Sequence, residues 1–525
     1  MKIINRDYNY YENPRINNLH ELLNLQSTNY PNDVAFSYKK DNEKIKVTYK
    51  EVYNDVINLS SYFNKNYKNK HIALIGENSY NWIITFVSII LSGNVCVVID
   101  KDLNESDIKK LLKISDTKII CYSEYYLPFI KDMKYKTFTI DEIDEYMEMG
   151  KNFQNKYVTS DNNDAAIFFT SGTTGANKAV VLSEKNIVTD IYAAAALFKP
   201  NGSVVSFLPY HHAFGLITGV LKPFYYHKEI FICKSLKYLM NDFKENKPDT
   251  IFAVPAFVET FYKQIWKRAR LEHKDKILKR SIKVSNTLLK MNIDIRKKLF
   301  KDILNEFGGD LNYIICGGAY LDKKYVKWFR SIGIEILNGY GITECSPVVS
   351  VNRNHYYKDG SVGKICRDVD VKIIDNEICV SGNIIMKGYY KDKKATNEVV
   401  IDGYFHTGDL GYIDKNGFLF ITGRKKNIII LSNGENISPE IIESEILKDK
   451  AVNEVVVCEE SNKLIAYIYP TDDYLGDQEY FDNLIYNYNK NRPKNHQIAL
   501  AKLRTEEFIK NNNGKILRDK VREEV

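Results

Sequence analysis

The residues best suited to chemistry gather in one short segment. Residues 168–181 read FFTSGTTGANKAVV, where an apolar run leads into hydroxyl side chains and glycines and then reaches Lys178. Gly172 and Gly175 permit backbone conformations in which several N–H groups point inward, and the lysine adds positive charge. The hydroxyl donors are Thr170, Ser171, Thr173 and Thr174. This set predicts a cradle for a polyphosphate, with an ordinary flexible turn as the alternative.

The cradle is not a Walker A loop. That motif places its lysine directly between a glycine and a serine or threonine, whereas here Asn177 precedes Lys178 and Ala179 follows it. A different family of nucleotide sites is therefore indicated.

A second segment, residues 338–347, reads NGYGITECSP. Tyr340 could stack on a base, Thr343 could donate to a phosphate, and Glu344 could bind Mg²⁺, which prefers oxygen ligands. A structural turn with a buried tyrosine would have a similar sequence. Three further segments follow along the chain: residues 403–414 (GYFHTGDLGYID), residues 423–443 (GRKKNIIILSNGENISPEIIE) and residues 513–518 (NGKILR).

These five segments, in this order, resemble the acyl- and aryl-adenylate-forming superfamily, which includes acyl-CoA synthetases, luciferases and peptide-synthetase adenylation domains. The resemblance extends from about residue 30 to about residue 520. Within the superfamily the chain is most similar to the long-chain fatty acyl-CoA synthetase branch. The segments that carry this similarity are LPYHHAFGL (208–216), CGGAYL (316–321), GYGITECSPVVSVN (339–352) and SNGENISP (432–439).

The resemblance implies a role for each matching residue. Lys178, His212, Glu344 and Lys515 would be catalytic, with Glu344 also the Mg²⁺ ligand and His212 a gate near the acyl carboxylate. Lys515 would bridge the substrate carboxylate and the nucleotide during adenylation, and Lys426 would be the hinge of the C-terminal domain. The nucleotide would be bound by Thr170, Ser171, Gly172, Thr173, Thr174, Gly175, Lys178, Gly317, Gly318, Ala319, Tyr340, Gly341, Thr343, Asp409 and Arg424. The thiol channel would be formed by His212, Gly434, Glu435 and Asn436.

The implied reaction uses ATP and Mg²⁺ to convert a carboxylic acid, expected to be a fatty acid, into acyl-AMP, and then transfers the acyl group to CoA. A carboxylate attacking a phosphorus meets another anion, so the site must supply positive charge and oriented dipoles more than covalent chemistry. Two alternatives stay open. The acceptor could be the phosphopantetheine of an acyl carrier protein, or the chain could be a non-catalytic nucleotide-binding protein with the same fold.

The pattern of elements predicts an α/β fold. Apolar, β-rich runs alternate with amphipathic stretches, which is typical of parallel sheets between helices. The strand candidates are residues 71–75, 117–122, 165–170, 203–208, 250–254 and 311–316, and the helix candidates are residues 105–114, 322–331 and much of 263–307. DKNG at 414–417 predicts a hairpin turn, and SPEIIESEIL at 438–447 predicts a helix start.

We therefore expect a large multilayer N-terminal domain over residues 1–425, with two α/β sheet subdomains and a small β-barrel-like subdomain at about 350–425. A small, mobile α+β C-terminal domain over residues 427–525 would turn on Lys426.

The amino-acid composition limits the classes of partner that are expected for this protein. The net charge of +7, from 74 basic and 67 acidic residues, is mild, and the lysines are spread along the chain, which argues against a nucleic-acid binder. Residues 82–99 are apolar, but Gly93 and Asn94 interrupt them, so a buried helix followed by a strand is expected in place of a membrane span. The N-terminus lacks a secretion signal, so a cytoplasmic protein is expected. Peripheral contact with a membrane surface remains compatible with the charge.

Overall fold

The computed structural model describes residues 10–41, 43–153, 163–171, 177–430, 436–461, 463–490, 492–493, 496–510 and 516–523. The chain divides into two compact units. Residues 1–371 and 380–405 form the first unit, and residues 372–379 and 406–525 form the second.

A nine-stranded sheet in the first unit positions most of the predicted site. Its order is β15-β14-β13-β12-β11-β9-β10-β1-β2, and β1, β10, β9, β11, β12 and β13 are parallel neighbours. Loops at the carboxyl ends of these strands therefore meet along one edge. The strands are β1 (Val34–Lys40), β2 (Glu43–Thr48), β9 (Val204–Ser206), β10 (Ile230–Ile232), β11 (Thr250–Ala253), β12 (Tyr313–Cys316), β13 (Glu335–Gly341), β14 (Val348–Val351) and β15 (Lys364–Ile365).

A seven-stranded sheet completes the first unit, in the order β18-β8-β7-β4-β3-β5-β6. Its central strands are buried on both faces, in keeping with their continuous apolar sequences. The strands are β3 (His71–Ile75), β4 (Val95–Val98), β5 (Ile119–Tyr122), β6 (Lys136–Thr139), β7 (Asp164–Ser171), β8 (Asn177–Ser183) and β18 (Gly388–Tyr389).

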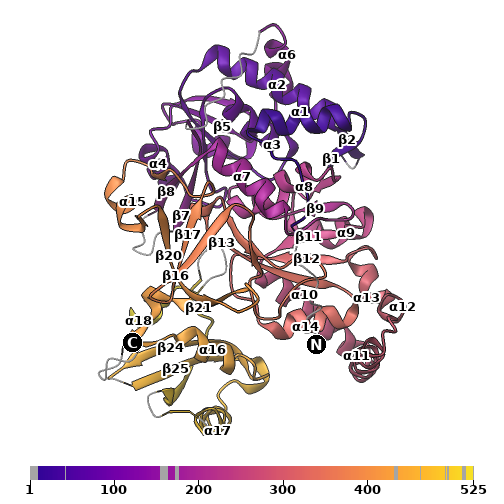
Figure 1. Cartoon of the computed structure of the whole chain (residues 1–525), viewed down its shortest axis with the longest axis vertical. Coiled ribbons are helices and arrows are strands. Elements are labelled where there is room, and N and C mark those ends of the chain that lie inside the picture. Colours follow the sequence, from indigo (N-terminus) through magenta and orange to yellow (C-terminus); the bar gives the residue numbers. More distant parts are fainter. Residues whose placement is uncertain are drawn as a thin grey trace. The chain divides into compact units, whose positions relative to one another are not determined.

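Helices surround these sheets (Figure 1). The longer ones in the first unit are α1 (Leu19–Asn29), α2 (Tyr49–Asn66), α3 (Tyr80–Leu91), α4 (Glu105–Ile114), α6 (Ile143–Gly150), α7 (Glu184–Ala195), α9 (Leu239–Asn246), α10 (Pro255–Leu271), α11 (Asp275–Lys290), α14 (Lys323–Ile332) and α15 (Lys393–Val399). Short helices are α5 (Leu127–Ile130), α8 (Lys222–Tyr225), α12 (Arg296–Leu299) and α13 (Lys301–Glu306), with a π-helix, η2, at Phe214–Leu221.

The predicted elements agree closely with these bounds. The apolar stretch at 82–99 forms most of α3, a turn and β4, and residues 263–307 form the end of α10 with α11 to α13. No helix among the described residues is long and apolar enough to cross a membrane.

A five-stranded sheet follows the nine-stranded one in the sequence. Its order is β16-β17-β20-β19, with β21 also paired to β20. The strands are β16 (Val369–Ile374), β17 (Glu377–Gly382), β19 (Val400–Ile401), β20 (Tyr404–Ile413) and β21 (Leu419–Arg424), and the predicted turn at 414–417 joins the last two. The boundary between the two units falls inside β16, β17 and β20.

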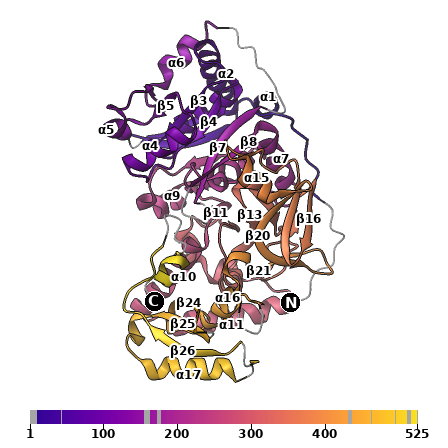
Figure 2. The same ribbon diagram turned by 90° about the vertical axis from the view of Figure 1, so that its left-hand side faces the viewer.

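The second unit continues with a three-stranded sheet of β24 (Val452–Glu460), β25 (Lys463–Pro470) and β26 (Ile498–Leu503). Its two faces form separate cores: α16 (Pro439–Ile446) and α17 (Gln478–Asn489) pack on one, and α18 (Arg518–Glu523) packs on the other. Figure 2 shows α17 along this sheet. A two-stranded ribbon, β22 (Ile429–Ile430) and β23 (Asn436–Ile437), precedes α16. The predicted helix start at Pro439 is confirmed, with proline at its first position.

Candidate active site

The carboxyl edge of the nine-stranded sheet brings two predicted nucleotide segments together. β12 leads into Gly317–Ala319, and the parallel neighbour β13 ends in Gly339–Gly341, with Cys316 opposite Asn338 in the ladder. Gly341 packs so closely that a Cβ there would lie 2.0 Å from the carbonyl oxygen of Pro347. Gly318 has φ +85°, which disfavours other residues. These glycines allow the segments after β12 and at the end of β13 to pack closely against neighbouring backbone. The backbone N–H and C=O groups of these segments then lie at the carboxyl edge of the sheet.

The predicted phosphate cradle begins on one strand and ends on its antiparallel partner. β7 and β8 pair antiparallel, and Thr170 lies directly opposite Lys178. The return strand β8 was not predicted, because the glycines and hydroxyls of the cradle resemble a loop and conceal the strand that follows. Gly172, Thr173, Thr174 and Gly175 lie outside the described residues, and Ser171 is described only in its backbone.

Tyr389 connects the cradle to the glutamate segment. β18 extends β8 antiparallel, with Tyr389 opposite Val180. The Lys178 ammonium lies 4.4 Å from the centre of the Tyr389 ring, and the Tyr389 hydroxyl donates to Glu344 Oε1 at 2.9 Å. Burial and the Glu344 charge both raise the pKa of Tyr389, so its hydroxyl stays protonated and donates. Lys178 and Glu344, 166 positions apart in the sequence, thus both contact the side chain of Tyr389.

Glu344 lies in a single 3₁₀ turn, η4 (Thr343–Cys345), which packs against β8. The carboxylate side chain is buried, and the Glu344 carbonyl accepts a hydrogen bond from Met386 N at 2.8 Å. The turn is also fixed from the other side, where Asp190 of α7 accepts from Val348 N at 2.7 Å. Burial raises the pKa of Asp190.

Neither Tyr389 nor Asp190 was predicted to serve the site. The only sequence signal for Asp190 is one carboxylate inside an apolar stretch, IVTDIYAAAAL at 187–197. Tyr389 gave no signal, because a tyrosine in GYYKD looks like any surface turn residue.

His212 lies on the segment between β9 and η2, at the same carboxyl edge of the sheet. Two residues later, the Phe214 ring lies 3.3 Å from where a Cβ of Gly317 would be. The half-buried His212 ring contacts that of His211, with centroids 4.3 Å apart, and His211 Nε2 is 3.2 Å from Asp100 Oδ1. The pKa of His211 is lowered by burial and by the neighbouring His212 and Lys101.

In the second unit, Asp409 and Arg424 face each other across β20 and β21. Asp409 Oδ1 is 2.8 Å from Arg424 Nε, and the aspartate side chain is buried. Thr407 accepts from Asp409 N at 3.0 Å and donates to the carbonyl of Ile378 at 2.7 Å. These two residues, both predicted to bind the nucleotide, are therefore direct neighbours joined by an ion pair.

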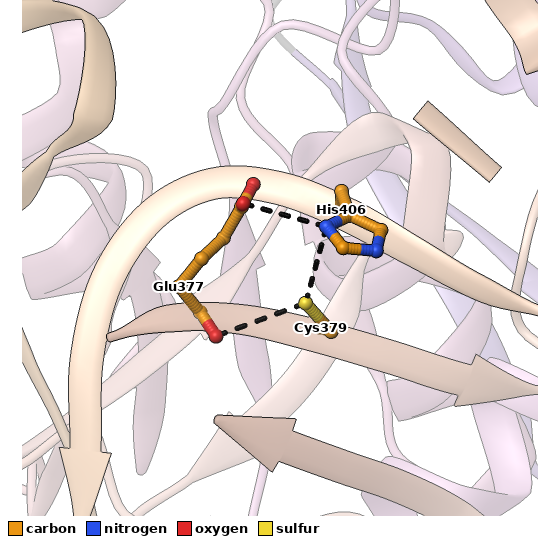
Figure 3. Close-up of side chains that lie close together, drawn as sticks. All are labelled: Glu377, Cys379 and His406. Carbon is orange, nitrogen blue, oxygen red and sulfur yellow. Dashed lines mark hydrogen bonds and ion pairs between the residues drawn. The ribbon is translucent and has the colours of Figure 1, made fainter. Parts of the chain in front are cut away.

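Glu377 anchors the residue after Arg424. Its carboxylate accepts from Lys425 Nζ and from Gly408 N, both at 2.9 Å. His406 Nδ1 lies 3.4 Å from Glu377 Oε2 and 3.4 Å from Cys379 Sγ (Figure 3). One nitrogen faces both neighbours, so the trio cannot relay a proton through the ring.

Burial and Glu377 raise the pKa of Cys379 to about 11, which keeps its thiol protonated. One of the groups that Glu377 holds is Lys425, which precedes Lys426. Lys426 itself lies exposed in the 3₁₀ turn η5 (Lys425–Asn427), and its role as a hinge stays a prediction.

The C-terminal motif is tied to α16. Arg518 pairs with Glu443, a buried carboxylate that also accepts from Val457 N at 2.6 Å. Lys510 and Ile516 form a β-bridge on either side of the segment that contains Lys515. Lys515, Gly434 and Glu435 lie outside the described residues, and only the backbone of Asn436 is described. Glu443 was not predicted as part of the site.

The donors in the first unit fit a nucleotide with Mg²⁺. Glu344 offers a carboxylate and Thr343 a hydroxyl, both oxygen donors of the kind Mg²⁺ prefers, and among the described residues no cluster of thiol and imidazole ligands that would favour zinc includes either residue. Lys178 supplies positive charge beside them.

The sequence matches the family model described as AMP-binding enzyme over residues 23–390. The chain is 28% identical to long-chain-fatty-acid–CoA ligase 5 of Rattus norvegicus, covering 85% of this chain and 74% of that protein. It is 24% identical to long-chain-fatty-acid–CoA ligase FadD15 of Mycobacterium bovis, covering 76% and 73%.

The fold matches o-succinylbenzoate CoA synthetase (MenE) of Bacillus subtilis in complex with an acyl-adenylate, with a TM-score of 0.73, 20% identity, and coverage of 95% and 97%. The similarity inferred from the five motifs and the α/β multilayer fold class are confirmed.

Proposed function

Because the chain belongs to the AMP-binding enzyme family and is an AMP-forming acid–CoA ligase, we propose that its acid substrate is a fatty acid. In the first step the carboxylate attacks the α-phosphorus of ATP and pyrophosphate leaves. In the second step the CoA thiol attacks the acyl carbonyl and AMP leaves.

The meeting of Lys178 and Glu344 at Tyr389 carries this proposal. Adenylation brings a carboxylate onto a phosphate, so a cation and a metal-binding carboxylate are needed at the same place. Bound Mg²⁺ would neutralise phosphate charge. Lys178 would hold the β- and γ-phosphates, Thr343 the α-phosphate, and Gly317–Ala319 with Tyr340 would flank the adenine.

Lys515 has the role of bridging carboxylate and nucleotide in the first step only. The Glu443–Arg518 pair supports this role, because it fixes the chain three residues beyond Lys515 to the core of the second unit. Between the two steps, a rotation of the C-terminal domain about Lys426 would then move Lys515 away from the nucleotide and open the thiol channel of His212 and residues 434–436.

Two observations support a fatty substrate. The well-covered relatives described above are ligases of long-chain fatty acids by name. In addition, the segment after His212 is the apolar π-helix η2, whose side chains from Gly215 to Leu221 are all buried. Aromatic side chains of Phe207 and Phe257 pack 5.0 Å apart at the end of β9 and the start of α10. A pocket for an alkyl chain needs apolar side chains, and apolar segments of this kind lie next to His212 in the sequence.

The test is ATP–pyrophosphate exchange with a panel of long-chain, medium-chain, aromatic and amino acids. We expect exchange with fatty acids and Mg²⁺. Exchange with an aromatic or amino acid alone would contradict the substrate, and no exchange with any acid, in protein that still binds ATP, would favour a non-catalytic role.

A second assay offers the acyl-AMP to CoA and to a carrier protein bearing phosphopantetheine. We expect CoA to be the better acceptor. Lys515→Ala should abolish acyl-AMP formation and spare thioester formation from supplied acyl-AMP; equal loss of both steps would contradict the role of Lys515.

A further inference from the structure

The helices between β11 and β12 have a higher net positive charge than the whole protein, so the net charge is less evenly distributed than the spread of lysines along the chain suggested. Residues 263–301 contain fourteen Lys and Arg against three Asp and Glu, a net charge of +11, whereas the whole chain has +7. The rest of the chain is therefore net negative. Thirteen of the fourteen basic side chains belong to exposed residues. We call the exposed side chains of residues 263–301 the basic helical surface; α11 and α12 lie at the periphery of the first unit (Figure 1).

Large apolar side chains are exposed on the same surface. Leu271 at the end of α10 is 73% exposed, Ile277 61%, Val284 51% and Met291 64%. Ile277, Val284 and Met291 follow at intervals of seven residues, so along α11 and its C-terminal cap, Met291, they form one stripe roughly 20 Å long. Isolated exposed aliphatic residues are common on proteins, but an aligned row of them is not expected on a face that meets only water.

Packing fixes which way this stripe points. Leu278 and Ser285 are the buried residues of α11, and Ser285 Oγ donates to the carbonyl of Ser331 at the end of α14. Asn286 Nδ2 donates to Ser331 Oγ at 3.1 Å. In a helix, Ile277 and Val284 lie about 100° before Leu278 and Ser285, so the stripe faces outward along the edge of the helix.

Basic residues lie beside the stripe. Lys276, Arg280 and Lys283 are exposed and occupy the solvent face next to Ile277 and Val284. An apolar row bordered by lysines and arginines is the arrangement of helices that lie in the interface of a bilayer. The aliphatic side chains can enter the headgroup region while the basic groups contact phosphates.

We propose that the basic helical surface is a docking surface for the anionic headgroups and upper acyl region of a lipid bilayer. The charge of +11 is complementary to such a membrane, and each basic group near it adds to the attraction. Nucleic acid matches the charge but not the aliphatic row, and the row has no exposed aromatic ring on which a base would stack. The surface uses no residue assigned to adenylation, so the proposal stands or fails independently of the proposed function.

The test is co-sedimentation of the full chain with vesicles of phosphatidylcholine alone or with about 30% phosphatidylglycerol. We expect binding to the anionic vesicles only, weakened by raising salt from about 0.1 M to about 0.5 M. The variant Lys276→Gln/Arg280→Gln/Lys283→Gln should lower the partition coefficient about tenfold or more. Ile277→Gln/Val284→Gln should lower it too, with net charge unchanged.

Two matched control variants remove the same kinds of side chain, basic or aliphatic, from other exposed surfaces. Lys109→Gln/Lys110→Gln/Lys113→Gln makes the same charge change on the exposed face of α4, and Ile114→Gln/Leu236→Gln removes two other exposed aliphatic side chains. Both should bind like the wild type, and all variants should keep the circular dichroism and ATP–pyrophosphate exchange of the wild type.

Equal weakening by the α4 and α11 charge variants would overturn the proposal, as would failure of the wild type to bind anionic vesicles at low salt. Retention on immobilised polyglutamate without vesicle binding, unaffected by Ile277→Gln/Val284→Gln, would assign the surface to an acidic protein and equally overturn it.

Discussion

Replacing Tyr389 with phenylalanine tests how the site is assembled. The change keeps the ring beside Lys178 and removes only the hydroxyl that donates to Glu344 at 2.9 Å. A hydrogen bond to a charged group contributes about 1.5–3 kcal/mol, and more of this is lost when the acceptor is buried, as Glu344 is. If that bond orients the carboxylate for Mg²⁺, the kcat/KM of ATP–pyrophosphate exchange should fall roughly 10- to 100-fold.

The neighbouring residue provides the control. The Tyr390 hydroxyl also donates to a carboxylate at 2.9 Å, but to Asp116, which has no assigned role in the reaction. Tyr390→Phe should change exchange by less than about twofold, and it should cost less stability than Tyr389→Phe because the Asp116 side chain is 39% exposed. A higher Mg²⁺ concentration should partly restore the exchange activity of Tyr389→Phe, because the misplaced Glu344 carboxylate would still bind the metal, only more weakly. Equal effects of the two variants, or a Tyr389→Phe enzyme with unchanged exchange at all Mg²⁺ concentrations, would refute the reasoning.

Two further predictions concern the second unit. Glu443→Gln leaves Arg518 with a weaker partner in a largely buried site, which should destabilise the unit by about 3 kcal/mol. The variant should also reduce acyl-AMP formation more than thioester formation from supplied acyl-AMP. Unfolding curves and assays of the two half-reactions measure these effects, and an equal loss of both half-reactions would contradict the prediction. Burial alone would raise the pKa of Glu377, but hydrogen bonds from Lys425, Gly408 N–H and His406 lower it overall. The ionised carboxylate therefore stabilises the folded state at pH values above its ordinary pKa. This stabilisation is lost as the pH falls through the lower pKa that Glu377 has in the folded state. Glu377→Gln should therefore unfold at lower urea than the wild type at pH 7, with the difference shrinking below about pH 4; a constant difference across this range would show that the ion pair is not the cause.

The sequence carried the chemistry in contiguous motifs. The cradle at 170–178 and the segment at 340–344 could be assigned chemistry because each combines local backbone freedom with donors or charges, whereas the roles of Asp409 and Arg424 followed from the family resemblance. The same holds for β3, which was predicted from a continuous apolar run, and for α4, which was predicted as an amphipathic helix; both have the expected bounds. The local pattern sufficed because short-range periodicity and glycine content determine these features.

The partners of those motifs depended on the tertiary structure. Tyr389 lies beside both Lys178 and Glu344 only because β18 extends β8 as an added strand, and Asp190 reaches Val348 N only because α7 packs beside β14. Pairings of this kind join residues from 45 to 211 positions apart, and no local pattern specifies which strand will add to which sheet edge. The sequence by itself therefore predicted which residues bind a nucleotide and a metal. Packing decided which neighbours hold those residues in place, because a hydrogen bond or a cation–ring contact exists only once the surrounding core fixes both of its ends.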